Sequence, residues 1–231
     1  MSVKTYRDVA IEYRPEITGL AGPIFGVVLK GRKSFASLEE KQHYVTYIQA
    51  NTQHPQRLLE SDFTPIDTQK VTEIRFFPPT KGIQPIDIIP FNTYQAGFDF
   101  LISEKALNVL KQHRIPHINH LSATIHSLQA KYAMVGFPLV PNERIDFGKS
   151  TFFDPERRRT ITYKDHQEYA QSITAYYPST LYVLGVGNYD IIHLENQGLY
   201  FSDNFFQAME ASGIIGISKG PSVLYNTMRV T

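Results

Sequence analysis

The residues best suited to gripping a partner form one short charged run. An acid at Asp154 and another at Glu156 precede three consecutive arginines. Each guanidinium presents a planar fork of donors that matches a carboxylate, so three together can hold an acidic partner. Loops on a rigid scaffold commonly carry function, which makes this run a candidate partner-binding surface; a merely solvated loop is the alternative. The candidate residues are Asp154, Glu156, Arg157, Arg158 and Arg159.

One catalytic motif occurs by spacing alone. Gly216 to Gly220 read Gly-Ile-Ser-Lys-Gly, which matches the G-x-S-x-G of a nucleophile elbow. That elbow needs a strand before the serine, a helix after it, and a later acid and histidine. Here a helical pattern comes before the motif, Pro221 follows it, and residues 219–231 contain no acid or histidine. The sequence therefore favours a tight turn at Gly216–Gly220.

Metal and cofactor chemistry find little support. Four histidines, His113, His117, His120 and His126, lie within fourteen residues, but Pro116 interrupts any helix between the first two. In an extended chain His117 and His120 point to opposite faces, and no acid stands close by. The chain has no cysteine, which excludes disulfides and cysteine-based zinc sites. We therefore predict no metal, no cofactor and no catalytic residue.

A hydrolase with an acid–histidine pair hidden in the fold remains an alternative. The nearest such pair is Asp190 and His193, which would face opposite sides of a strand. Tyrosines are also frequent in this half of the chain. They are more typical of a core or half-buried position than of an interface, although interface anchors stay possible. The tyrosines concerned are Tyr163, Tyr169, Tyr176, Tyr177 and Tyr182.

Composition bounds the class of protein. The 231 residues are 42% hydrophobic, 13% aromatic and 19% charged, with a formal net charge of +1, which is typical of a globular chain. So balanced a charge predicts no attraction to nucleic acid or to an anionic membrane. The N-terminal residues lack the apolar core of a signal peptide, and no apolar stretch approaches about 18 residues. We expect a cytoplasmic protein without a membrane partner.

Hydrophobic patterns predict an α+β fold in which helices pack on mixed or antiparallel sheets. Leu38 to Asn51 should form a helix with Ser37 as its cap. Prolines punctuate residues 55–90, with short strands at 71–77 and 86–89. Further predictions are a strand over 133–140 and a hairpin over 180–194 that turns at Gly187 and Asn188. We expect an N-terminal α+β subdomain over residues 1–90, which is either separate from or part of one domain with the α+β domain over residues 91–231.

Two segments of the second half repeat each other. Residues 100–115 and 199–214 align without a gap, and each reads as a strand followed by a serine and a helix, within units spanning 98–115 and 199–214. The serines, Ser103 and Ser202, can accept from free N–H groups of the first helical turn, and an acid follows each. Gly213 stands where a left-handed C-cap is needed. The pattern predicts two similar units; a chance match is the alternative.

With these motifs, residues 90–218 resemble bacterial immunity proteins of polymorphic toxin systems, specifically the group numbered eleven, formerly a domain of unknown function. The segments that carry the likeness are Phe98–Leu110, Arg114–Ile125, Ile145–Phe152 and Asp190–Ile217. The resemblance implies binding of a cognate toxin and self-protection in the cytoplasm. It implies no catalytic residue.

The prediction from sequence is thus a non-catalytic protein that neutralises a toxin or effector by direct contact, as a monomer or weak homo-oligomer. The alternatives are an uncharacterised hydrolase, and a structural or adaptor protein of a phage or secretion assembly. A pocket with converging acids would favour the first. A large apolar homo-oligomeric interface would favour the second.

Overall fold

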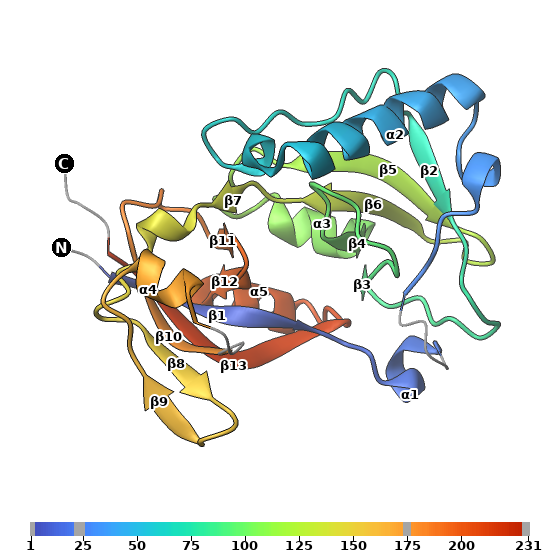
Figure 1. Cartoon of the computed structure of the whole chain (residues 1–231). Helices are drawn as coiled ribbons and strands as arrows, with labels where there is room; N and C mark the ends of the chain where they lie inside the picture. The colour runs from blue at the N-terminus through green and yellow to red at the C-terminus, as the bar shows by residue number, and fades with distance from the viewer. Residues whose placement is uncertain (1–2, 21–25, 173–176, 228–231) are drawn as a thin grey trace. The chain divides into compact units, whose positions relative to one another are not determined.

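The computed structural model describes residues 3–20, 26–172 and 177–227, and within them the chain forms two compact units (Figure 1). Of the described residues, unit 1 contains 3–10, 139–172, 177–207 and 219–227, and unit 2 contains 11–20, 26–138 and 208–218. Residue 90, where the sequence predicts a boundary, lies inside the continuous 26–138 segment. Strands on both sides of that point, at 73–76, 88–89 and 100–103, belong to one sheet of unit 2.

Unit 1 is built on a mixed sheet, which has eight strands in the described residues, in the order β7-β11-β12-β1-β13-β10-β8-β9. Its aromatic and aliphatic core includes Tyr6, Phe152 and Tyr200, each fully buried. The elements are β1 (Val3–Ile11), β7 (Leu139–Val140), η3 (Asn142–Arg144), β8 (Thr151–Asp154), β9 (Arg159–Ile161), α4 (His166–Ala170), β10 (Tyr177–Leu184), β11 (Ile191–Leu194), β12 (Gly198–Ser202), α5 (Asp203–Ala211) and β13 (Ile217–Thr227). The division between units falls within β1, α5 and β13.

Unit 2 is built on a mixed sheet of five strands in the described part of the chain, in the order β2-β5-β6-β4-β3. Helix α2 runs along this sheet (Figure 1), and Tyr44 of α2 is buried in the same core as Ile74 and Met134. The elements are α1 (Pro15–Thr18), η1 (Gly31–Ser34), α2 (Leu38–Gln53), η2 (Pro55–Leu58), β2 (Glu73–Phe76), β3 (Ile88–Ile89), β4 (Phe100–Ser103), α3 (Glu104–Leu110), β5 (Asn119–Ile125) and β6 (Lys131–Gly136).

The α+β prediction is confirmed, and so are the predicted helix caps. Ser37 accepts a hydrogen bond from the N–H of Glu40 at 3.0 Å. Ser103 accepts from Ala106 and Ser202 from Phe205, each at 3.2 Å. Gly213 has φ +61°, the left-handed conformation predicted for it. These features depend on residues a few positions apart, which local sequence determines well.

The two strand–serine–helix units are present, and each contains an aspartate that the sequence alignment does not include. In unit 2 the Ser103 hydroxyl donates to Asp87 at 2.7 Å; in unit 1 the Ser202 hydroxyl donates to Asp190 at 2.6 Å. The backbone N–H of each serine also donates to the carbonyl of the same aspartate, at 2.7 and 2.8 Å. The aspartate therefore accepts the hydrogen bond that the serine hydroxyl donates, and the lone pairs of the serine oxygen are left to accept from the helix N–H groups.

Three local predictions are wrong. Residues 180–194 are not a hairpin, because β10 pairs with β8 and β13 whereas β11 pairs with β7 and β12. Residues 133–140 are not one strand, because β6 ends at Gly136 and β7 begins at Leu139 in the other sheet, with Pro138 between them. Residues 216–220 are not a tight turn, because β13 begins at Ile217. In each case the structure depends on which distant strand a segment pairs with, and the local turn residues do not determine that pairing.

Candidate functional site

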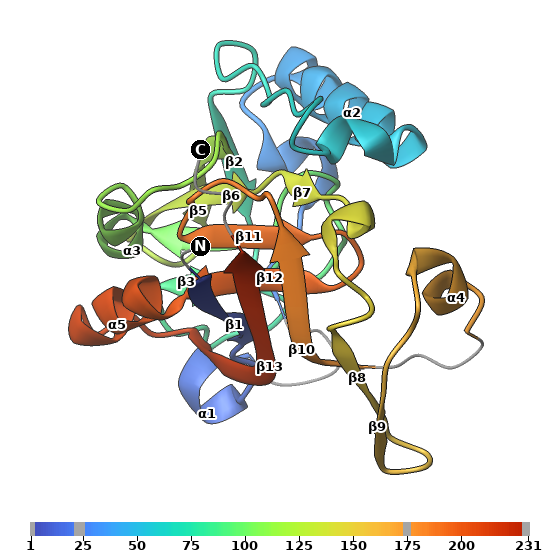
Figure 2. The same cartoon turned by 90° about the vertical axis from the view of Figure 1, so that its left-hand side faces the viewer.

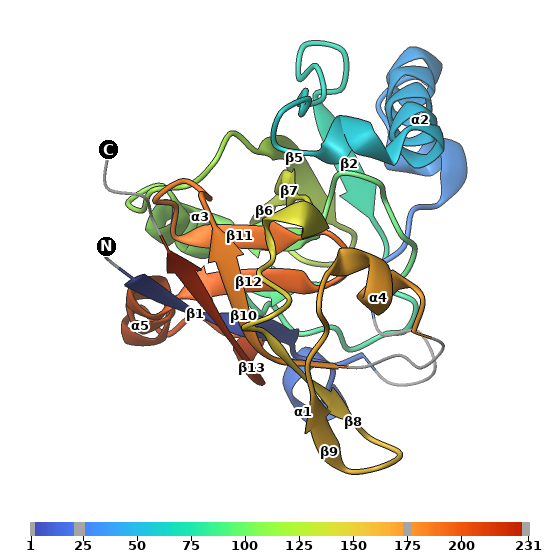
Figure 3. The ribbon, with the colours of Figure 1, turned by 60° about the vertical axis from the view of Figure 1, so that its left-hand side comes forward.

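The charged run lies at the end of the β8–β9 hairpin of unit 1. Phe152 pairs with Ile161, Phe153 with Thr160 and Asp154 with Arg159, so residues 155–158 form the connecting loop. Strand β9 is the outermost strand of its sheet. Figures 2 and 3 show the hairpin projecting beyond β10 and α4. The loop is therefore presented on a paired, regular support.

Asp154 supports this loop from inside. Its side chain is 2% exposed, and one carboxylate oxygen accepts from the backbone N–H groups of Glu156 at 3.0 Å and Arg157 at 3.1 Å. The other oxygen lies 3.9 Å from Nε of Arg159, whose side chain is 58% exposed. Asp154 thus fixes the loop backbone and one guanidinium and offers little surface to a partner.

Glu156, Arg157 and Arg158 are exposed on the loop. Within the part of the chain that the structure describes, the guanidinium groups of Arg157 and Arg158 have no ion-pair partner. Arg158 has φ +49°, a left-handed conformation that costs a residue with a Cβ roughly 1–2 kcal/mol. The turn therefore holds arginine in a conformation that glycine would adopt more easily.

Two aromatic side chains are exposed on the strands that support the loop. Phe153 is 39% exposed and Tyr177 is 63% exposed, and the two residues are register partners on β8 and β10. Exposed aromatic residues next to arginines are the composition typical of energetic hot spots in protein interfaces. Of the tyrosines considered from sequence, Tyr163 is buried, Tyr169 and Tyr182 are half-buried, and Tyr176 lies outside the described residues.

Phe153 is the residue that sequence reasoning missed. Side chains alternate between the two faces of a strand, so with Phe152 and Asp154 buried, Phe153 must face outward. Beneath it, Phe152 packs edge-on against Tyr163 with ring centroids 5.3 Å apart and stacks on Phe147 at 6.0 Å. This aromatic layer is the buried side of the hairpin. The hairpin surface, as used below, means Phe153, Arg157, Arg158, Arg159 and Tyr177.

A second feature of unit 1 is an open hollow of about 560 Å³ between the segment 143–148 and the start of α4. His166 stacks on Phe147 with ring centroids 5.7 Å apart, and its Nδ1 lies 3.9 Å from Glu143. The two aspartates that line the hollow already have partners. Asp165 caps α4 by accepting from Glu168 N–H at 2.9 Å, and Asp146 pairs with Lys149 at 3.0 Å.

The other residues considered for chemistry are dispersed. Among the described residues, no group of three or more histidine, aspartate, glutamate or cysteine side chains could hold a metal ion. Burial lowers the pKa of His120, with Lys111 adding to the effect, and His126 packs on Phe77 at 5.2 Å. Ser218 lies on β13. Asp190 is committed to Ser202 and to Lys4, whose Nζ is 2.8 Å away.

No family model matches the chain, and no curated protein matches it. Within residues 3–20, 26–172 and 177–227, no helix has the length and apolar character needed to cross a membrane.

Proposed function

We propose that this protein is an immunity protein, which binds a cognate bacterial toxin in the cytoplasm and neutralises it by direct contact without catalysing a reaction. The observation that carries the proposal is the hairpin surface, where three exposed guanidinium groups lie on or next to a loop fixed by a buried carboxylate and two exposed aromatic rings lie on the strands that support it. The resemblance of residues 90–218 to the group-eleven immunity proteins points the same way.

The chemistry of this surface predicts the chemistry of the partner. Guanidinium groups bind carboxylates bidentately, and aromatic rings supply apolar contact area at low conformational cost. We therefore expect the toxin to present an acidic patch beside an apolar one. Because Asp154 holds the loop before any partner arrives, little ordering cost opposes binding.

The hollow near α4 gives the hydrolase alternative less support than its residues suggest. Asp165 and Asp146 are engaged in a helix cap and an ion pair, which are structural roles. A general base needs a free acceptor atom that lies within hydrogen-bond distance of the substrate proton that it removes. We expect the variant Glu143→Gln/His166→Ala to neutralise the toxin as well as the wild-type chain does.

The experiment is coexpression with the toxin encoded beside this gene, with growth as the readout. The test variant is Arg157→Glu/Arg158→Glu/Arg159→Glu. The control places the same charge change on unit 2, as Arg57→Glu/Lys70→Glu/Lys81→Glu, at three exposed positions. Wild type and control should restore growth. The test variant should fail, with an affinity at least about 100-fold weaker, since hydrogen bonds to charged groups contribute about 1.5–3 kcal/mol each.

Two results would contradict the proposal. One is toxicity that the wild-type chain does not relieve. The other is equal rescue by both triple variants, which would remove the hairpin surface from the account. Thermal unfolding of each variant should accompany the growth assay, because a misfolded variant would mimic lost binding.

A further inference from the structure

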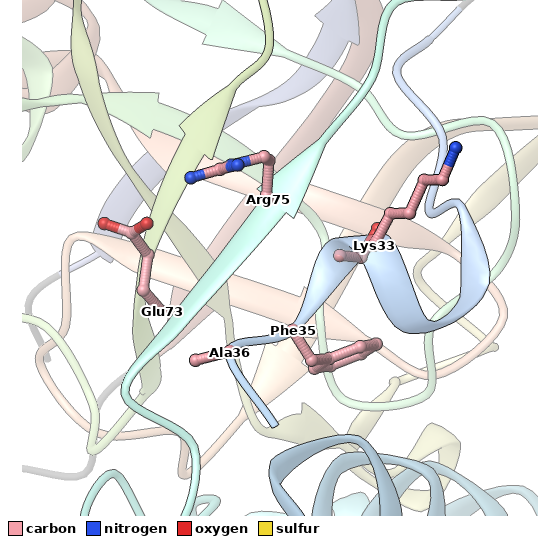
Figure 4. Close-up of a pocket in the computed structure, with 6 residues that line it drawn as sticks. Lys33, Phe35, Ala36, Glu73 and Arg75 are labelled. Carbon is pink, nitrogen blue, oxygen red and sulfur yellow. The ribbon is translucent and has the colours of Figure 1, made fainter. Parts of the chain in front are cut away.

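Unit 2 contains two adjoining hollows that share Phe35 as a wall. One is a groove of about 210 Å³ between α2 and the segment around η1. Its lining is apolar over most of its surface, and its lining residues are Leu29, Gly31, Phe35, Lys41, Tyr44, Val45, Ile48, Gln49 and Gln95. The other is a pocket of about 160 Å³ lined by Lys33, Ser34, Phe35, Ala36, Glu73 and Arg75. Figure 4 shows β2, with Glu73 and Arg75, next to the segment that carries Lys33, Phe35 and Ala36; in this view the side chains of Glu73 and Arg75 extend to one side and that of Lys33 to the other.

The pocket exists because η1 bulges away from the edge of β2. Val28 bridges Phe77 and Phe35 bridges Ile74, both antiparallel, so residues 29–34 lie opposite residues 75–76 alone. The six-residue excursion leaves space beside Arg75. Bulges at sheet edges commonly redirect side chains next to functional sites.

Cations predominate around the two hollows. Arg32, Lys33, Lys41 and Arg75 have no ion-pair partner in the described residues, and Lys30 lies over the ring of Phe77 at 5.1 Å. The nearby acids are engaged instead. Glu40 accepts from the Thr72 hydroxyl at 2.7 Å and from Ala36 N–H at 3.1 Å. Glu73 accepts from Thr124 at 3.3 Å, and Glu39 lies 3.7 Å from His43.

We propose that these hollows form a docking surface for an acidic, apolar peptide segment of a partner protein. An apolar side chain would fill the groove between Val45, Ile48 and Phe35. Neighbouring acidic residues would pair with Arg75 on one side of this segment and with Lys33 on the other. The assignment rests on charge complementarity and on none of the residues of the hairpin surface. Binding should weaken as salt rises, since these cations are exposed.

The test starts from a random seven-residue peptide library displayed on phage and selected against the full chain. Enriched peptides should contain a large apolar residue near Asp or Glu. One of them, made synthetically with a fluorescent label, is the probe for all affinity measurements. Lys33→Glu/Arg75→Glu should weaken its binding at least tenfold. Lys70→Glu/Lys81→Glu, at exposed positions of the same unit that line neither hollow, should leave binding unchanged.

A second pair of variants tests the groove itself. Gln49 and Gln42 are both exposed on α2, but Gln49 lines the groove and Gln42 does not. Gln49→Trp should fill the groove and abolish binding of the labelled peptide, whereas Gln42→Trp should not. Both changes replace an exposed side chain, so both variants should fold.

Three outcomes would overturn the inference. These are enriched peptides without acids, equal binding by the test and control variants, or binding of a labelled 12-nucleotide RNA that Lys33→Glu/Arg75→Glu abolishes while no peptide is selected. The hairpin variant Arg157→Glu/Arg158→Glu/Arg159→Glu should bind the labelled peptide as tightly as the wild-type chain does. Failure of the docking surface is therefore distinguishable from failure of the proposed toxin contact.

Discussion

In unit 1, Asp190 and Ser202 lie opposite each other where β11 begins and β12 ends; in unit 2, Asp87 and Ser103 hold the same places on β3 and β4. Each aspartate fixes a serine that caps a helix. The cations differ, since Lys4 lies 2.8 Å from Asp190 with its side chain 20% exposed, whereas Lys105 lies 3.5 Å from Asp87 and is 52% exposed.

The exposed surfaces of the two units differ more than their Asp–Ser helix caps do. Unit 1 presents the hairpin surface, an exposed loop rich in arginine on a projecting hairpin, with two exposed aromatic rings on β8 and β10. Unit 2 presents a hollow with an apolar floor and a basic rim. The part that repeats is therefore structural, and the part that does not repeat is where we place binding. The predictions below test that division, beginning with the largest effect.

The largest change in the free energy of unfolding is expected at alkaline pH, and buried tyrosines of both units should contribute to it similarly. Burial raises the pKa of Tyr6 in unit 1 and of Tyr132 in unit 2 to about 12. A raised pKa means that the folded state keeps its proton longer, so this stability is complete below pH 10 and is lost as pH rises through about 12. Urea unfolding from pH 8 to 12 should show it. Tyr6→Phe and Tyr132→Phe should each flatten the curve, and a curve flattened by neither would contradict the assignment.

The aspartates should differ in cost. Asp190→Ala leaves the Ser202 hydroxyl without its acceptor and removes the anionic partner of the partly buried Lys4, which keeps only neutral acceptors such as the Tyr189 carbonyl at 2.8 Å; we expect a loss of about 3 kcal/mol in the free energy of unfolding. Asp87→Ala should cost about 1–2 kcal/mol, because its lysine is half exposed to water. Urea unfolding at pH 7 measures both. An Asp87→Ala variant as unstable as Asp190→Ala would contradict this difference between the units. If Asp190→Ala does not fold, Ser202→Ala and Ser103→Ala replace the aspartate variants in the same comparison.

Asp154 should behave as a support of the hairpin. Asp154→Ala removes the acceptor of two backbone N–H groups, and we expect it to cost about 2 kcal/mol in the free energy of unfolding. Asp154→Asn should recover part of that loss, because its amide oxygen can accept the same bonds. The toxin affinity of both variants, measured well below their unfolding temperatures, should be lower than that of the wild-type chain. Asp154→Ala should lose more affinity than Asp154→Asn, because its loop is less well held. Unchanged stability in Asp154→Ala would contradict this role.

Arg158 offers the smallest effect and the sharpest separation of folding from binding. Arg158→Gly should raise the free energy of unfolding by about 1 kcal/mol, because glycine adopts φ +49° without a steric cost. The same change removes one guanidinium and should weaken toxin binding about tenfold. Calorimetry on the purified pair, with Arg157→Gly as the control for lost charge, measures both quantities. Greater stability with undiminished affinity would exclude Arg158 from the contact.

Sequence predicts what short-range chemistry controls. The serine caps at Ser37, Ser103 and Ser202 follow from residues three positions apart. The Asp–Ser bonds do not, because Asp87 precedes its serine by 16 residues and Asp190 by 12, so a gap-free alignment of the repeat cannot include both. The turn residues at Gly187 and Asn188 likewise do not predict that β10 pairs with β13.

For the candidate site, sequence predicts that residues 156–159 are charged and lie in a loop, and it groups Asp154 with them. It does not show that Asp154 faces inward or that Phe153 faces outward, since that choice depends on which face of β8 is covered. Tyr177 joins the site only because β10 pairs with β8. The docking groove of unit 2 is set by contacts between η1 and α2 and by the bulge beside β2, which no local pattern predicts.

The most direct test of the account is amide hydrogen exchange on the complex of this chain with its neighbouring toxin. We predict that binding slows exchange across residues 153–160, while the strands around Asp87 and Ser103 exchange as they do in the free chain. A tight complex in which the hairpin exchanges at its free rate would contradict the claim that neutralisation works through this surface.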